Sequence, residues 1–191
     1  PSGTFCVFFR SETRLSGSEQ AASWWSSLCA FLNNQVYAEK HRVWPLAAGL
    51  SHGDAAGEQL AMEELAEPLG WRDELWRGMF RGKGWMSKRL PRVSKAPARV
   101  VNARSPCPRG CTWKHKGLRR DSCKTESCYR SCKKLHKPIL RAECPHREAI
   151  EALILLEHRR REIEARIVEE LIAEGKRCCE SMNLCPLRQQ R

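Results

Sequence analysis

The amino-acid sequence predicts a mainly α-helical protein with a small helical subdomain, an extended basic arm, a cysteine-rich module and one long C-terminal helix. Apolar residues recur at helical spacing near both ends of the chain, whereas Lys and Arg concentrate in its middle. Six of the 11 cysteines lie between positions 107 and 144. We expect this chain of 191 residues to consist of four segments: residues 1–80, 81–106, 107–146 and 147–191.

The first segment is acidic and has the signals of a long first helix. Phe5 to Phe9 is compatible with a short strand before it. Ser16 and Glu19 have the spacing of a capping box, which would begin the helix. Its predicted apolar face consists of Trp25, Leu28, Leu32 and Val36, and Trp44-Pro45 should lie beyond its end.

Two shorter helices should follow in the same segment. The second begins at Ser51 or Asp54, with a thin apolar stripe of Leu60, Ala61 and Leu65, and Pro68 and Gly70 should end it. The third covers residues 71–80. The tryptophans of this subdomain are expected to be core or contact residues.

Positive charge is confined to one block of the chain. Residues 76–147 contain 21 Lys and Arg but only 3 Asp and Glu, whereas the residues on either side are net acidic. Such a block repels itself unless a polyanion neutralises it, and nucleic acid is the commonest such partner. A basic surface that faces an acidic protein or anionic lipid is the alternative.

Residues 81–106 begin this block and have no helical or strand periodicity. They contain three prolines, two glycines and eight Lys or Arg residues, a composition typical of an extended, solvated arm or a disordered linker. Trp85 offers a ring for base stacking among the cations. The candidate RNA-binding residues are Arg81, Lys83, Trp85, Lys88, Arg89, Arg92, Lys95, Arg99, Arg104, Lys114, Lys116, Arg119 and Arg120.

The cysteine-rich module contains an internal repeat. The pattern C-x-R-x-C-x-x-x-H-K occurs at Cys107 and again at Cys128. Thiolates and imidazoles at this spacing suit zinc, although the common C-x-x-C pattern is absent. Disulfides and reduced structural thiols are the other two interpretations. The candidate residues for a metal or disulfides are Cys107, Cys111, His115, Cys123, Cys128, Cys132, His136 and Cys144.

Two Cys-x3-Cys motifs, Cys107/Cys111 and Cys128/Cys132, are separated by sixteen residues. They resemble those of the twin-CX3C proteins of the mitochondrial intermembrane space. That resemblance implies two helices joined by two disulfides. Pro108 and Gly110 depart from it because they weaken the first helix. More loosely, a long helix flanked by cysteines is similar to the accessory subunits of respiratory complex I.

The last predicted helix covers residues 146–176 and is the clearest of all. Gly175 should end it. Its charged side chains, including Glu157 through Glu162 and His158, are expected to face solvent. Its apolar face is traced by Ile150, Leu153, Leu156, Ile163, Ile167 and Leu171.

Known catalytic motifs are absent from the sequence. There is no P-loop, nucleophile elbow, metalloprotease motif or dinucleotide fingerprint, and no apolar run is long enough for a membrane-spanning helix. We therefore expect a non-catalytic structural protein of a large ribonucleoprotein that contacts rRNA and neighbouring proteins, with no small-molecule substrate. A mitochondrial ribosome is favoured over a cytosolic one. The rival hypothesis is a disulfide-stapled accessory subunit of a mitochondrial respiratory complex.

Overall fold

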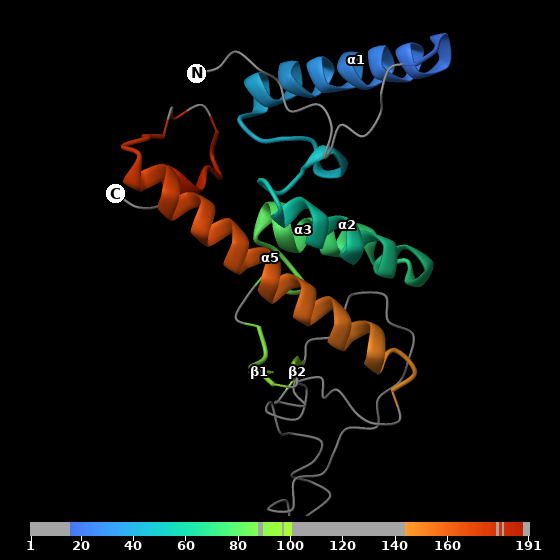
Figure 1. Cartoon of the computed structure of the whole chain (residues 1–191), viewed down its shortest axis with the longest axis vertical. Helices are drawn as coiled ribbons and strands as arrows, with labels where there is room; N and C mark the ends of the chain where they lie inside the picture. Colours follow the sequence, from blue (N-terminus) through green and yellow to red (C-terminus); the bar gives the residue numbers. More distant parts are fainter. Residues whose placement is uncertain are drawn as a thin grey trace, which may run out of the picture. The chain divides into compact units, whose positions relative to one another are not determined.

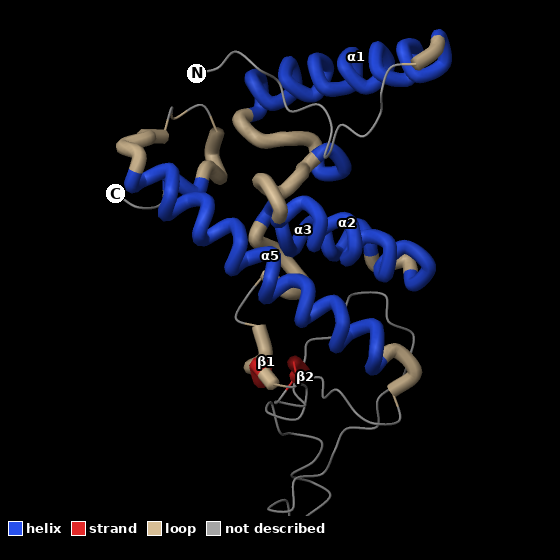
Figure 2. Tube along the Cα trace, in the orientation of Figure 1, coloured by secondary structure: helices blue, strands red, loops and turns tan. Residues whose placement is uncertain are grey.

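The computed structural model describes residues 16–87, 90–96, 98–100, 144–178, 180 and 182–188. In this part of the chain the protein is mainly helical, which confirms the predicted fold class (Figures 1 and 2). A two-stranded antiparallel sheet is the other regular structure described. The predicted strand at Phe5 to Phe9 and the cysteine module up to residue 143 lie outside the described residues.

Helix α1 spans Ser18–His41, close to the predicted limits. The capping box at Ser16 was wrong, since the N-cap is Gly17, in an extended conformation and without a side-chain hydrogen bond. At the other end, Arg42 adopts the left-handed conformation and its N–H donates to the Ala38 carbonyl at 2.7 Å. The helix therefore ends before Trp44-Pro45, as predicted.

Helices α2 and α3 follow as expected. Helix α2 spans Ala55–Ala66, and the short 3-10 turn η2, Glu67–Leu69, follows it directly. Gly70 ends this turn in the left-handed conformation, with a φ of 68°, which confirms its predicted role as a helix-ending residue. Helix α3 spans Arg72–Arg81. A second short turn, η1, covers Leu46–Ala48 between α1 and α2.

The buried face of α2 differs from the predicted one. Leu60 and Leu65 are 45% and 37% exposed, so the expected stripe through these residues was wrong. The buried positions are Ala55, Ala56, Gln59, Met62, Glu63 and Ala66, which repeat at helical spacing. Two of them are polar, and apolar periodicity alone could not identify a face that depends on a buried amide and a buried carboxylate.

A β-hairpin occupies part of the predicted arm. Strand β1, Val93–Lys95, pairs antiparallel with β2, Ala98–Val100, so that Val93 lies opposite Val100. The prediction that residues 81–106 lack regular structure was therefore wrong for these positions. Strands of three residues are too short to show a period of two in the sequence.

Helix α5 spans Arg147–Ala173, and Gly175, with a φ of 73°, lies just beyond it. The predicted long helix is thus confirmed, and Ile150, Leu153 and Leu156 are buried as expected. The prediction that the whole charged run from Glu157 to Glu162 faces solvent was wrong. Glu157 and Arg160 are buried and His158 is half-buried. Arg160 contacts Ser51 and His158 contacts Pro91, so distant parts of the chain cover these two side chains. Among the described residues, no helix has the length and apolar character needed to cross a membrane.

The chain divides into two compact units, to both of which α2 and α5 contribute. Unit 1 comprises residues 1–61 and 159–191, and unit 2 comprises residues 62–158. The described buried apolar side chains of unit 1 are the small residues Ala38, Ala55 and Ala56. Those of unit 2 are larger and form a conventional core: Met62, Ala66, Trp71, Leu75, Trp85, Met86, Cys144, Ile150, Leu153, Ile154 and Leu156.

Unit 1 instead depends on polar contacts. The Ser51 N–H donates to Gln59 Oε1 at 2.7 Å, and Gln59 Nε2 donates to the Gly49 carbonyl at 2.9 Å. Arg160 donates to Ser51 Oγ at 3.0 Å and to Glu164 at 2.6 Å. At the C-terminal tail, the Asn183 N–H donates to the Arg42 carbonyl at 2.8 Å, which ties Asn183 to the end of α1.

Candidate nucleic-acid interface

The basic segment begins as a tight turn that packs back on α3. Gly82 ends the helix in the left-handed conformation, and the Lys83 N–H donates to the Arg77 carbonyl at 3.2 Å. The Trp85 N–H then donates to the buried Glu74 carboxylate at 3.2 Å. Arg77 lies 3.5 Å from the same carboxylate. The buried negative charge of Glu74 is therefore compensated by a backbone donor and a cation.

Two glycines allow this turn to approach so closely. A Cβ at Gly78 would overlap the Trp85 carbonyl oxygen, and a Cβ at Gly84 would lie 2.6 Å from Glu74 Oε1. Gly84 also has a φ of 85°, which side-chain-bearing residues rarely adopt. The turn from Gly82 to Ser87 thus depends on the absence of side chains at both positions.

Trp85 is a core residue. It is 3% exposed, and its ring meets that of Trp71 edge-on at a centroid distance of 5.6 Å. Trp71 in turn meets the His146 ring at 5.1 Å. The prediction that Trp85 stacks on bases is therefore corrected, because the ring is enclosed by the fold. The ring instead fixes the start of the basic segment to the core of unit 2, of which it is part.

Helix α5 holds the second half of the segment through two hydrogen bonds. The Val100 N–H donates to Glu151 Oε1 at 2.8 Å, and His158 Nε2 lies 2.8 Å from the Pro91 carbonyl oxygen. Since a carbonyl oxygen can only accept, Nε2 carries the proton. Glu151 and His158 are seven residues apart and so share one side of the helix. Sequence reasoning missed both residues, because their partners are 51 and 67 positions away.

The result is a set of cations displayed on a docked segment. Lys83, Arg92, Lys95 and Arg99 are exposed, and we name them the cation set. None of the four has an ion-pair partner in the part of the chain that the structure describes. Arg81 is half-buried at the end of α3, and its guanidinium donates to the Phe80 carbonyl at 3.0 Å.

The other predicted RNA-binding residues have no described position. Lys88 and Arg89 lie between described segments, and five more lie beyond residue 100: Arg104, Lys114, Lys116, Arg119 and Arg120. Residues 107–136 of the predicted metal or disulfide set likewise lie outside the described residues. Cys144 is described as a buried free thiol. No group of three or more His, Cys, Asp or Glu residues among those described could hold a metal ion.

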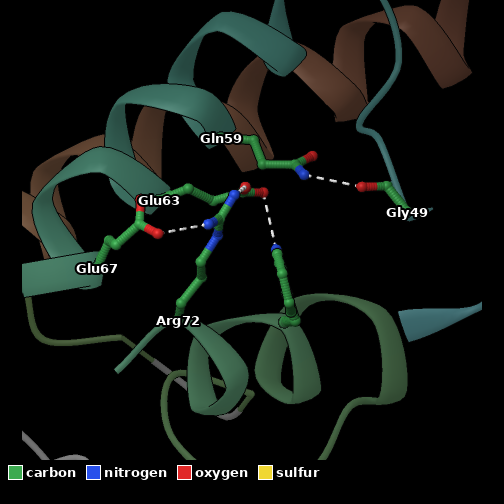
Figure 3. A network of polar contacts seen from close by, with 6 residues as sticks. Gly49, Gln59, Glu63, Glu67 and Arg72 are labelled. Atoms are coloured by element: carbon green, nitrogen blue, oxygen red, sulfur yellow. Dashed lines mark hydrogen bonds and ion pairs between the residues drawn. The ribbon is translucent and has the colours of Figure 1, made fainter. Parts of the chain in front are cut away.

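Carboxylates of unit 2 are already engaged within the fold. Glu63, which is buried, accepts from Trp76 Nε1 at 2.8 Å and lies 3.3 Å from Arg72 Nη2. Arg72 also donates to Glu67 at 2.8 Å, as Figure 3 shows. Its guanidinium lies 4.9 Å from the Trp76 ring centroid. These internal contacts fix α2 to α3. Helical spacing indicates which side chains share a face, but it does not indicate that these side chains pair.

The C-terminal tail brings together two thiols. Cys178 and Cys185 are free and half-buried, and the Glu180 N–H donates to Cys178 Sγ at 3.3 Å. Burial, followed by a hydrogen bond with Cys178, raises the pKa of the Cys185 thiol. Cys185 is therefore protonated at neutral pH.

Comparison with known proteins gives one partial match. A family model described as a prokaryotic E2 domain matches residues 1–46, about a quarter of the chain, and does not reach the basic segment. Neither a curated protein nor a solved structure matches the chain.

Proposed function

We propose that this chain is a non-catalytic structural protein of a large ribonucleoprotein and that its basic middle binds RNA. The observation that carries the proposal is the cation set. Lys83, Arg92, Lys95 and Arg99 are exposed on a docked segment and have no described acidic partner. Phosphates would neutralise them and release counterions, which is the main source of RNA affinity for such a surface.

The scaffold supports this proposal in a second way. Neighbouring carboxylates serve the fold, since Glu74 accepts from the Trp85 amide and Glu151 accepts from the Val100 amide. Each carboxylate accepts from a backbone N–H, and no ion pair between it and the cation set is described. A segment that is ordered before binding also loses less conformational entropy on RNA than a free arm does.

The finer assignment extends the same reasoning. We propose a ribosomal protein that contacts rRNA and neighbouring proteins, with a mitochondrial ribosome favoured over a cytosolic one. Zinc is the proposed cofactor of the cysteine module, where Cys107, Cys111, Cys128 and Cys132 repeat with His115 and His136. The E2-domain match covers residues 1–46, which include neither the cation set nor the cysteine module.

Sedimentation of the endogenous protein tests the proposal. We expect the tagged chain to sediment in a large particle on a sucrose gradient and to move to the top after ribonuclease treatment. Intact mass with and without chelator then determines whether zinc is bound. A particle that resists ribonuclease, with cysteines oxidised in pairs, would instead support the disulfide-stapled accessory subunit and overturn the proposal.

A further inference from the structure

The outward side of α1 carries an apolar stripe that the structure leaves exposed. Trp25 is 60% exposed, Leu32 is 45% exposed and Val36 is 66% exposed, and the Cys29 thiol between them is also exposed. We name these four residues the outer stripe. Three of them, Trp25, Leu32 and Val36, belong to the apolar face that the sequence predicts for this helix, whereas the buried residue described for it is Ala38.

The spacing of the outer stripe is that of a coiled-coil contact. Its members are separated by four, three and four residues, so they occupy successive a and d positions of a heptad. Cys29 behaves as a small apolar residue at such a position. No charged residue occurs between Glu19 and Glu39. The middle of α1 therefore lacks the charges that normally cover a solvent-facing helix.

The charges at the two ends of α1 indicate which helix packs against the outer stripe. Glu19 lies in the first turn. The last turn contains Lys40 and His41 beside Glu39, and Arg42 follows as the C-cap, so this end of the helix is net basic. A second α1 in antiparallel orientation would place the acidic first turn of each copy beside the basic last turn of the other. It would also oppose the two helix dipoles. A parallel pair would bring like charges together at both ends.

We propose that the outer stripe is a homodimer interface, in which α1 packs antiparallel against α1 of a second copy of this chain. Such a pair has two-fold symmetry, so each contact occurs twice. Trp25 of one copy lies opposite Val36 of the other, and Cys29 lies opposite Leu32. Glu19 lies near Lys40 of the second copy. This inference does not depend on the proposed RNA-binding role.

The test is the oligomeric state of the full chain, measured by sedimentation velocity in reductant and without nucleic acid over a range of micromolar concentrations. The account predicts a reversible dimer. Leu32→Glu places a carboxylate inside the stripe, and we expect dimerisation at least about a hundredfold weaker. Ala30→Glu adds the same charge at an exposed position of α1 outside the stripe and should leave dimerisation unchanged.

A charge exchange tests the orientation without disturbing the stripe. Glu19→Lys should weaken the dimer by about tenfold at low salt, and adding Lys40→Glu should restore it. In a parallel pair the single change would only replace one like-charge contact with another. A monomeric wild-type chain, a dimer indifferent to Leu32→Glu, or failure of the double exchange to restore dimerisation would overturn the proposal. Circular dichroism confirms that each variant keeps its helices.

Discussion

The Glu151 carboxylate accepts a hydrogen bond from the Val100 amide at 2.8 Å and so joins α5 to strand β2. The two residues are 51 positions apart. The same helix holds Pro91 through His158, seven residues further on. Together the two contacts turn a proline-rich, basic stretch into a docked hairpin that presents Lys95 and Arg99 to solvent.

Removal of the Glu151 acceptor should loosen this hairpin. Glu151→Ala leaves the Val100 amide without its partner, at a cost of about 1–3 kcal/mol in local stability. Hydrogen exchange should show faster exchange over residues 91–100, with the rest of unit 2 protected as before. Glu148→Ala, an exposed change one turn earlier in α5, is the control. Equal protection in both variants would show that the contact does not hold the hairpin.

Truncation of Trp85 should destabilise the fold as a core substitution does. Trp85→Ala removes a ring that is 3% exposed and meets Trp71, so we expect a loss of about 3–5 kcal/mol in the free energy of unfolding. Denaturant unfolding measures it. Leu60→Ala, at a half-exposed position of α2, should cost far less.

Trp85→Phe separates the structural role of the ring from a stacking role. It keeps an aromatic ring in the core, so RNA affinity should stay close to that of the wild type once the protein is folded. A large loss of RNA affinity in a folded Trp85→Phe variant would contradict its placement in the core.

The buried Glu63 carboxylate should matter more than its exposed neighbour. Glu63→Ala leaves Trp76 Nε1 without its acceptor and removes one of the two carboxylates that Arg72 contacts, the other being Glu67. We expect a loss of about 2 kcal/mol, reduced from the value for fully buried pairs because Arg72 is 39% exposed. Glu64→Ala is the matched control, since Glu64 is exposed on the same helix. Similar unfolding midpoints for the two variants would rule out the network as a source of stability.

Alkylation of Cys185 should have an alkaline pH profile. Its raised pKa means that the folded state holds the proton more tightly than the unfolded state. This contribution to stability is present at neutral pH and is lost as the pH rises through the folded pKa. The rate of Cys185 alkylation, followed by mass spectrometry, should rise at higher pH than that of a cysteine in an unstructured peptide. A midpoint at or below that of the peptide would contradict the burial of this thiol.

Periodicity predicted the helices well. The limits of α1 and α5 agree with the sequence to within a few residues, because both helices have long, regular apolar patterns. Gly70 and Gly175 were identified correctly as helix-ending residues, since both adopt the left-handed conformation. The direction in which α1 faces was not predictable, because apolar residues occur on more than one of its sides.

Local sequence could not predict the docking of the basic segment. Trp85 is surrounded by Lys and Arg, so its composition indicated a solvated arm, yet Glu74 and Trp71 fix it in the core. His158 belongs to a charged run that is typical of a solvent-facing side, but its partner is Pro91, 67 positions earlier. The cations themselves were predictable from charge alone, whereas their support depends on contacts between distant positions.

The salt dependence of RNA binding tests the central claim most directly. Fluorescence anisotropy of a labelled single-stranded RNA, titrated with the full chain at several salt concentrations, gives the slope of log K against log salt. Changing the four residues of the cation set to Gln should make the slope shallower by about 3, at roughly 0.7 for each phosphate neutralised. The control changes four exposed cations outside the segment to Gln: Arg166, Lys176, Arg177 and Arg188. The account predicts a steep wild-type slope that the control retains; equal slopes in all three proteins, or binding that does not depend on salt, would contradict it.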